Sequence, residues 1–372
     1  MKRRRWYLVG LVGAAVVAVA ALTTTSLAVA GSSSPKLTKV TVQLKWVTQA
    51  QFAGYYAAKA KGYYKAAGLD VNLKVGGPTI VNEQTVLSKQ AEFGVNWFPS
   101  LLANRDQGNN LVNIAQVFAR SGTTEVTFKK SGIDTFAKMR GKKFGVWIFG
   151  NEFEQRAALV KYGMDPDKDV TLVQQQFDMV AFLQGEIDAA SAMTYNEFAQ
   201  VLETKNPATG KLYTLADLNV FKYSTLGTAM LQDGIFVRGD WIAQKKNQAL
   251  AVKFLEATFK GWIYCRDHYK ECTNIVVSEG TALPKGHQTW QMNEINALIW
   301  PNKLGIGVMN PVDYAKTAAI SYKFNVIKEP ASQASYRTDL AKKAVANLQK
   351  QGLDTNGKKF KKATVVLTEG GK

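Results

Sequence analysis

The sequence is poor in the residues that build metal and redox centres. Among its 372 residues only two are cysteine, Cys265 and Cys272, and only two are histidine, His268 and His287. These four residues do not follow any recognised zinc-binding spacing, so we expect no metal site and no cofactor. No cysteine lies near residue 30, which argues against a lipid-modified amino terminus.

The two cysteines lie in one short stretch that is predicted to be helical. If both stayed on one continuous helix they would lie about 10 Å apart, which is too far for a disulfide. A disulfide therefore requires the helix to end between Cys265 and Cys272. The sequence alone leaves both the bonded and the free state open.

An apolar segment near the amino terminus predicts export. Trp6–Leu22 follows the basic stretch Lys2–Arg5 and precedes Ala28-Val29-Ala30, which has the small-x-small pattern of a cleavage site. We expect residues 1–30 to be a secretory signal peptide and the mature chain to act outside the cytoplasm, in the periplasm or at the cell surface. The basic stretch also fits a twin-arginine signal loosely. An uncleaved membrane anchor is the alternative, although the apolar segment is slightly short for a membrane span.

The charge is strongly positive but scattered. The formal net charge is +18, and removing the four basic residues of segment 1–30 leaves 18 − 4 = +14. The densest basic run, Lys358–Lys362, lies near the carboxyl end, where a solvated tail is the usual explanation. The chain lacks a stripe that interleaves basic and aromatic residues. We therefore expect no nucleic-acid partner.

The hydrophobic pattern predicts an α/β fold. Val40–Leu44 alternates as a strand does, Gln49–Lys65 has helical spacing, and Leu69–Leu73 alternates again. Similar alternation continues to about residue 195 and predicts parallel sheets covered by helices. Strands at 215–220 and 234–237 are expected to lead back to the first domain, and helices are predicted at 241–266, 288–300, 312–324 and 335–351.

Four predicted strands end at residues suited to holding a ligand, namely Trp46, Trp97, Asn151 and Tyr195. Ligands of open α/β sheets lie beyond the carboxyl ends of the strands. Core packing would explain any one of these aromatic residues, and helix capping would explain Asn151. Four such junctions, two in each predicted domain, favour a ligand cleft between the domains. The candidate ligand-binding residues are Trp46, Gln49, Gln51, Phe52, Asn96, Trp97, Gly150, Asn151, Tyr195, Asn196 and Glu197.

Two groups of motifs resemble a known family. The chain is similar to periplasmic binding proteins related to thiamine-pyrimidine synthase in two groups of motifs. The first group is Gln43-Leu44-Lys45-Trp46, the helix start at 49–56 and the stretch 61–71, and the second is 185–190 and 193–197. These proteins are the solute receptors of ABC importers for thiamine pyrimidine precursors or, in a close branch, riboflavin. The similarity covers roughly residues 37–240, and the first motif is closer to the riboflavin branch.

The resemblance implies a type II periplasmic-binding-protein fold with two lobes, each a sheet flanked by helices, and with the second lobe inserted into the first. We expect the first lobe at 31–120 and 221–372, the second at 121–220, and a hinge near 120 and 220–233. The resemblance makes Trp46 and Tyr195 stacking partners of a small heteroaromatic ligand, and it makes Asn96, Asn196 and Glu197 hydrogen-bonding groups. It also implies a monomer whose partners are an ABC permease and its ATPase.

Two rival functions share this fold. Thiamine-pyrimidine synthases carry a cysteine-rich iron motif and an active-site histidine after the first strand–helix–strand unit, whereas this chain has no cysteine before Cys265 and no histidine before His268. We therefore expect a protein that is not an enzyme. An alkanesulfonate receptor is the second rival, but it would need arginines at the strand ends, where this chain has Trp, Tyr, Asn and Glu.

Overall fold

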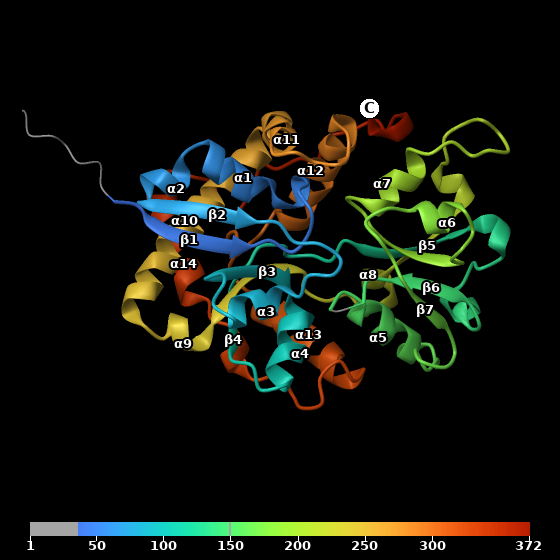
Figure 1. The fold of residues 1–372 in the computed structure, drawn as a ribbon, viewed down its shortest axis with the longest axis horizontal. Coiled ribbons are helices and arrows are strands. Elements are labelled where there is room, and N and C mark those ends of the chain that lie inside the picture. Colours follow the sequence, from blue (N-terminus) through green and yellow to red (C-terminus); the bar gives the residue numbers. More distant parts are fainter. Residues whose placement is uncertain (1–35, 149) are drawn as a thin grey trace, which may run out of the picture. The chain divides into compact units, whose positions relative to one another are not determined.

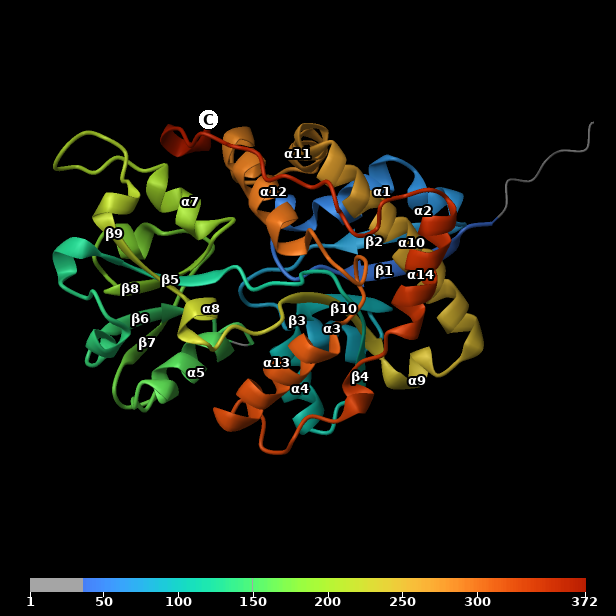
Figure 2. The same cartoon turned by 180° about the vertical axis from the view of Figure 1, so that it is seen from behind.

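The computed structural model describes residues 36–148 and 150–372. The predicted signal peptide, residues 1–30, lies outside the described residues. Residues 37–372 form one structural unit, and its described part contains two five-stranded sheets, each flanked by helices (Figure 1 and Figure 2). The predicted α/β fold class is therefore confirmed.

The first sheet has the strand order β2-β1-β3-β10-β4. β1 pairs in parallel with β2 and β3, whereas β10 is antiparallel to β3 and β4. The alternation that predicted the first strand places Val40 and Val42 in the core. The strands are β1 (Thr38–Gln43), β2 (Leu69–Lys74), β3 (Phe93–Trp97), β4 (Leu111–Gln116) and β10 (Asp233–Arg238).

The second sheet has the order β7-β6-β8-β5-β9 and comes from the chain between β4 and β10. β6 is parallel to β7 and β8, whereas β5 is antiparallel to β8 and β9. The strand predicted at 215–220 corresponds to β9, which pairs with β5 in the second sheet, whereas the strand predicted at 234–237 corresponds to β10 of the first sheet. The strands are β5 (Thr123–Phe128), β6 (Lys143–Val146), β7 (Thr171–Gln174), β8 (Ala189–Met193) and β9 (Leu218–Lys222).

We call the part built on the first sheet lobe I and the part built on the second sheet lobe II. Segments 117–122 and 223–232 connect them, and the buried carboxyl group of Glu154 accepts hydrogen bonds from both, namely from Ser121 Oγ at 3.0 Å and from the Met230 amide at 2.5 Å. A second link joins the Gly122 amide to Gln232 Oε1 at 2.8 Å. The two connecting segments are thus held together side by side. The predicted hinge and the predicted domain limits stay predictions.

Helices of lobe I break where the sequence pattern alone suggested continuity. The predicted helix 49–65 is divided into η1, α1 and α2. The break between α1 and α2 lies at Gly62, which adopts a left-handed backbone with φ of 72°. The predicted helix 241–266 is divided into α9 and α10. The helices of lobe I are η1 (Ala50–Phe52), α1 (Ala53–Ala60), α2 (Tyr63–Ala66), α3 (Asn82–Leu87), α4 (Phe98–Asp106), α9 (Gly239–Ile242), α10 (Lys245–Asp267), α11 (Tyr269–Ser278), α12 (Lys285–Ile299), α13 (Pro311–Lys323), η5 (Gln333–Ser335), α14 (Asp339–Lys350) and η6 (Glu369–Gly371).

Lobe II carries shorter helices on its sheet. They are η2 (Lys129–Ser131), η3 (Phe136–Met139), α5 (Phe153–Lys161), α6 (Val180–Leu183), α7 (Glu197–Leu202), η4 (Leu215–Asp217) and α8 (Tyr223–Leu226). Within the ranges 36–148 and 150–372, every helix is too short or too polar to span a bilayer.

The two cysteines are bonded across a helix end. α10 ends at Asp267 and α11 begins at Tyr269, and the Cα atoms of Cys265 and Cys272 lie 5.3 Å apart in a disulfide. The condition derived from helix geometry, that the helix must end between the cysteines, is therefore met.

Candidate ligand site between the two lobes

A small cavity of about 20 Å³ lies between lobe I and lobe II. Its walls come from the residues at or just after the ends of β1, β3, β6 and β8, which is where ligands lie in open α/β sheets. The lining residues are Lys45, Trp46, Gln49, Gln51, Trp97, Trp147, Asn151, Met193, Tyr195, Asn196 and Glu197.

Aromatic rings from both lobes form much of the cavity wall. Trp46 of lobe I meets Trp147 of lobe II edge to face, with ring centroids 6.2 Å apart. The indole nitrogen of Trp147 donates to the Gln176 carbonyl at 2.8 Å, and that of Trp97 donates to Asp233 Oδ1 at 2.9 Å. Each of these two rings is therefore anchored through its polar edge, which fixes its orientation.

Lys45 supplies a buried positive group to the lobe I side. Its Nζ donates to Asn96 Oδ1 at 2.6 Å, donates to Asn151 Oδ1 of lobe II, and lies 4.6 Å from the ring centroid of Trp97. Burial lowers the pKa of Lys45 to about 8, and the nearby carboxylates, that of Asp233 foremost, oppose this shift. Lys45 thus connects the two lobes directly.

Asp233 is the counter-charge behind the wall. It accepts from Gln51 Nε2 at 2.8 Å and from the Trp97 indole, and burial raises its pKa to about 6 despite the neighbouring Lys45. One carboxylate therefore orients two lining side chains.

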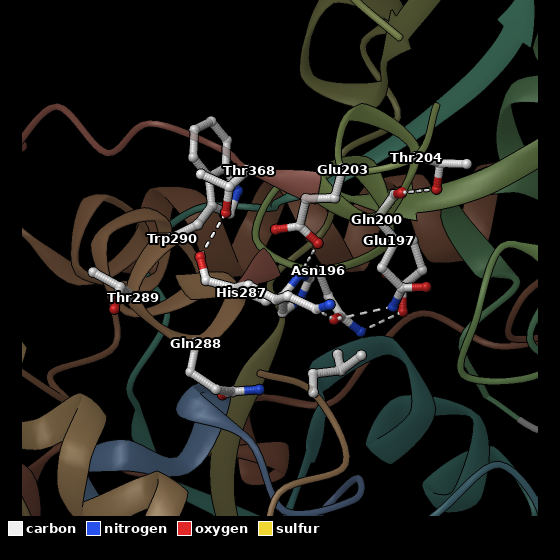
Figure 3. Close-up of polar contacts among 12 residues, drawn as sticks. Asn196, Glu197, Gln200, Glu203, Thr204, His287, Gln288, Thr289, Trp290 and Thr368 are labelled. Carbon is white, nitrogen blue, oxygen red and sulfur yellow. Dashed lines mark hydrogen bonds and ion pairs between the residues drawn. The ribbon is translucent and has the colours of Figure 1, made fainter. Parts of the chain in front are cut away.

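Asn196 and Glu197 form a polar pair on the lobe II side, at the start of α7. Asn196 Nδ2 donates to Glu197 Oε1 at 2.6 Å, and the Met193 amide donates to Glu197 Oε2 at 3.1 Å. Burial raises the pKa of Glu197 to about 7. The amide oxygen of Asn196 faces His287 Nε2 at 2.9 Å, and His287 Nδ1 lies 2.8 Å from Glu203 Oε2 (Figure 3).

The structure brings together eight of the eleven candidate residues as cavity lining: Trp46, Gln49, Gln51, Trp97, Asn151, Tyr195, Asn196 and Glu197. The other three lie elsewhere. Phe52 is fully buried in the lobe I core beside Tyr55. Asn96 lies behind the wall, where it accepts from Lys45, and Gly150 contributes an amide that donates to Glu152 Oε2 at 2.8 Å.

Sequence reasoning missed three lining residues and the histidine behind them. Lys45 was assigned to the alternation of the first strand, although β1 ends at Gln43. Trp147 was placed inside a strand predicted at 144–148, although β6 ends at Val146. Their positions next to Trp46 and at a strand end were the available signals. Met193 is the last residue of β8, and His287 carried no local signal. In the part of the chain that the structure describes, no group of three or more His, Cys, Asp or Glu residues is arranged to hold a metal ion.

The sequence also matches a known family. The profile of the family described as "NMT1/THI5 like" matches residues 49–272, which is more than half of the 372-residue chain. The chain belongs to this family. The NMT1/THI5-like region includes the lining residues from Gln49 to Glu197, whereas α12, α13 and α14 lie beyond it. The predicted resemblance is confirmed.

Two relatives of this NMT1/THI5-like chain have different names. The 4-amino-5-hydroxymethyl-2-methylpyrimidine phosphate synthase THI13 of Saccharomyces cerevisiae is 29% identical over 234 residues, which cover 61% of this chain and 66% of that protein. The riboflavin-binding protein RibY of Chloroflexus aurantiacus is 26% identical over 236 residues, which cover 62% and 64%. The match thus spans just under two thirds of each relative.

Solved structures share the fold. The alkanesulfonate-binding protein SsuA from Xanthomonas axonopodis pv. citri, bound to MOPS, is similar with a TM-score of 0.59 at 13% identity, over 81% of this chain and 99% of that protein. At this identity the likeness shows the fold alone, and it confirms the predicted periplasmic-binding-protein fold.

Proposed function

We propose that this protein is the extracytoplasmic substrate-binding component of an ABC importer and that it holds a small heteroaromatic vitamin or vitamin precursor between its lobes. The observation that carries the proposal is the cavity, whose aromatic walls and polar groups come from both lobes at strand ends. Flat π-faces suit a planar ring, and a few fixed polar groups set its orientation. The protein would act as a monomer that delivers its ligand to a permease and its ATPase, without catalysis.

Each lining group has a role in this proposal. Trp46 and Tyr195 stack on the ring, whereas Asn196 and Glu197 hydrogen-bond its edge. Lys45 adds a donor at the lobe I side, which a carbonyl oxygen of the ligand would accept from. Lobe closure about segments 117–122 and 223–232 would bring the two sets together around the ligand.

The candidate ligands are a thiamine pyrimidine precursor and riboflavin. One relative is named a riboflavin-binding protein and another a pyrimidine phosphate synthase, so both ring systems occur among the names in this family. The cavity has room for only about 20 Å³, about the space of one water molecule. Its size therefore does not choose between the two ligands, and either ring would need the lobes to part.

A synthase is the second candidate function, because the relative THI13 is named one and is 29% identical. The residues of this chain fit the synthase chemistry poorly, since its lobe I strand ends carry no histidine and no cysteine. His287 lies behind Asn196 and not on the cavity wall. Iron or pyridoxal phosphate retained through purification, seen as visible absorbance, would favour the synthase over the receptor.

The experiment that tests the receptor is a thermal-shift screen of residues 31–372 with riboflavin, thiamine, the formyl-aminopyrimidine and an alkanesulfonate. A bound ligand raises the melting temperature, because it stabilises the folded state by RT ln(1 + [L]/Kd). A shift with one heterocycle supports the proposal, and a shift with the sulfonate alone contradicts it.

Trp46→Ala then tests the placement of the site. Stacking of a ring on an aromatic side chain contributes about 1–3 kcal/mol, so the variant should bind roughly 5- to 150-fold more weakly by titration calorimetry. Trp241→Ala is the matched control, because Trp241 packs on Phe93 in lobe I and does not line the cavity. Equal affinity of the Trp46 variant and the wild type would refute the placement.

A further inference from the structure

His287 lies at the centre of a buried chain of four polar side chains that ends at the cavity (Figure 3). Glu203 Oε2 is 2.8 Å from His287 Nδ1, His287 Nε2 is 2.9 Å from Asn196 Oδ1, and Asn196 Nδ2 is 2.6 Å from Glu197 Oε1. All four residues are buried, and His287 is fully so. Only Asn196 and Glu197 reach the cavity wall.

We infer that His287 is a specificity-determining positioning residue, which fixes the amide of Asn196 so that the cavity selects ring edges carrying a hydrogen-bond acceptor next to a donor. The inference rests on the proposed function, since it assumes that the cavity binds a heteroaromatic ring. It deepens that proposal by naming the chemistry of the ring edge.

The hydrogen-bond directions at His287 follow from its partners. Both ring nitrogens face oxygen atoms, and an amide oxygen can only accept. Nε2 therefore carries a hydrogen and donates to Asn196 Oδ1, whichever of Nδ1 and Glu203 Oε2 holds the hydrogen shared between them.

The orientation of the Asn196 amide depends on this donor. The two ends of an amide have nearly the same shape, so the neighbouring donors and acceptors decide which way the group points. Asn196 Oδ1 also receives a long hydrogen bond from Gln200 Nε2 at 3.4 Å. The pKa of Glu197 is raised to about 7 by burial, so near neutral pH a protonated Glu197 can donate to a reversed Asn196 amide. The short contact with His287 opposes that reversal.

The fixed amide gives the cavity edge a defined polarity. Asn196 Oδ1 is occupied by His287, so the group that Asn196 offers to a ligand is the second hydrogen of Nδ2. Glu197, whose carboxylate receives hydrogen bonds from Asn196 and the Met193 amide, offers further lone pairs. A complementary ring edge has an acceptor opposite Asn196 and a donor opposite Glu197, as in a cyclic amide or an amidine.

The helix that carries His287 is anchored in lobe I. Gln288 Oε1 and Gln291 Oε1, also on α12, accept from the Ala50 amide at 2.7 and 2.8 Å, only four residues after Trp46. Asn196 belongs to lobe II. His287 thus reaches across from the lobe that carries Trp46 to orient a polar group of the other lobe, and the selection of ring edges requires the lobes to be closed.

The test compares each ring with an analogue whose edge donor is removed, using riboflavin with 3-methylriboflavin, and 4-amino-2-methylpyrimidine with 2,4-dimethylpyrimidine. For the pair that binds, we expect the wild type to prefer the intact ring at least tenfold by titration calorimetry. His287→Leu should reduce this preference to less than threefold, and His287→Gln should retain it, because the Gln amide can donate from about the position of Nε2. Thr289→Ala is the control on the same helix, since Thr289 bonds only within α12.

The outcomes separate this inference from the proposed function. If the wild type binds a ring but does not prefer the intact edge, or if His287→Leu keeps the preference, the inference is wrong and the receptor proposal stands. If the wild type binds none of these rings, the proposed ligand class is wrong and the inference falls with it.

A measurement on the wild type covers the case in which His287→Leu does not fold. Long-range proton–nitrogen NMR of the imidazole rings reports which nitrogens carry hydrogen, and the sequence contains only His268 and His287, so His268→Gln assigns the signals. We expect a hydrogen on Nε2 of His287. An unprotonated Nε2 would mean that Asn196 points the other way, which overturns the inference.

Discussion

Replacing Glu197 by Gln is expected to make the stability of the ligand-free protein less dependent on pH. Burial raises the pKa of the Glu197 carboxyl from its ordinary value of 4.5 to about 7 in the folded state. Because the folded pKa is the higher one, ionisation disfavours the folded state. The stabilising contribution of the neutral carboxyl is complete below pH 4.5 and is lost as the pH rises through 7. Because the pKa differs between the folded and unfolded states, raising the pH from 5.5 to 7.5 lowers the free energy of unfolding by about 2 kcal/mol.

Urea unfolding of the wild type and of Glu197→Gln at pH 5.5 and 7.5 measures this contribution by linear extrapolation. Glu154 and Asp233 are buried carboxyls with raised pKa values of about 7 and 6, so they add to the pH dependence in both proteins. The difference between the two proteins therefore isolates Glu197. Glu186→Gln, at an exposed position of the same lobe, makes the same change of charge and should keep the wild-type dependence. An equal dependence in Glu197→Gln would refute the argument from burial.

Two further predictions concern the framework of lobe I. Gly261→Ala should destabilise the protein by about 1–3 kcal/mol or more in urea unfolding, because its added Cβ would lie 2.0 Å from the carbonyl oxygen of Gly54 and force α1 and α10 apart. Gly77→Ala is the control, since its added Cβ meets open space, and it should change the free energy of unfolding by less than about 0.5 kcal/mol. Equal effects of the two substitutions would contradict the packing argument. The double variant Cys265→Ser and Cys272→Ser should lose about 2 kcal/mol, as expected for opening a loop closed over seven positions, and reduction of the wild type should reproduce most of that loss.

Sequence patterns predicted the strand-to-helix junctions well, because those junctions are local. The change from period two to helical spacing around Trp46 reports how consecutive side chains meet the core, and it needs no information about distant parts of the chain. The same holds for Tyr195, which follows a buried alternating strand. Most lining residues were therefore found by asking what stands directly after each strand.

The same patterns could not predict pairing across long distances. β9 alternates as any strand does, but alternation does not say which sheet edge a strand joins, and β9 completes lobe II. His287 is separated from Asn196 by 91 positions and from Glu203 by 84, and no repeat or spacing in the sequence connects them. Lys45 lies two residues after the observed end of β1, where a pattern of alternation no longer says which way a side chain points.

The ionisable groups at the cavity explain why a ligand would control closure. Burial shifts the pKa of Lys45 downward to about 8 and those of Glu197 and Asp233 upward to about 7 and 6. In each case the shift toward the neutral form means that the charged group is less well stabilised at its buried position than it would be in water. On the proposed function, parting the lobes would return water to the groups that line the cavity, Lys45 and Glu197, so their charges would favour opening. On the proposed function, a ring that hydrogen-bonds to these groups replaces that water only in the closed state. Its differential affinity for the closed state then shifts the equilibrium toward closure.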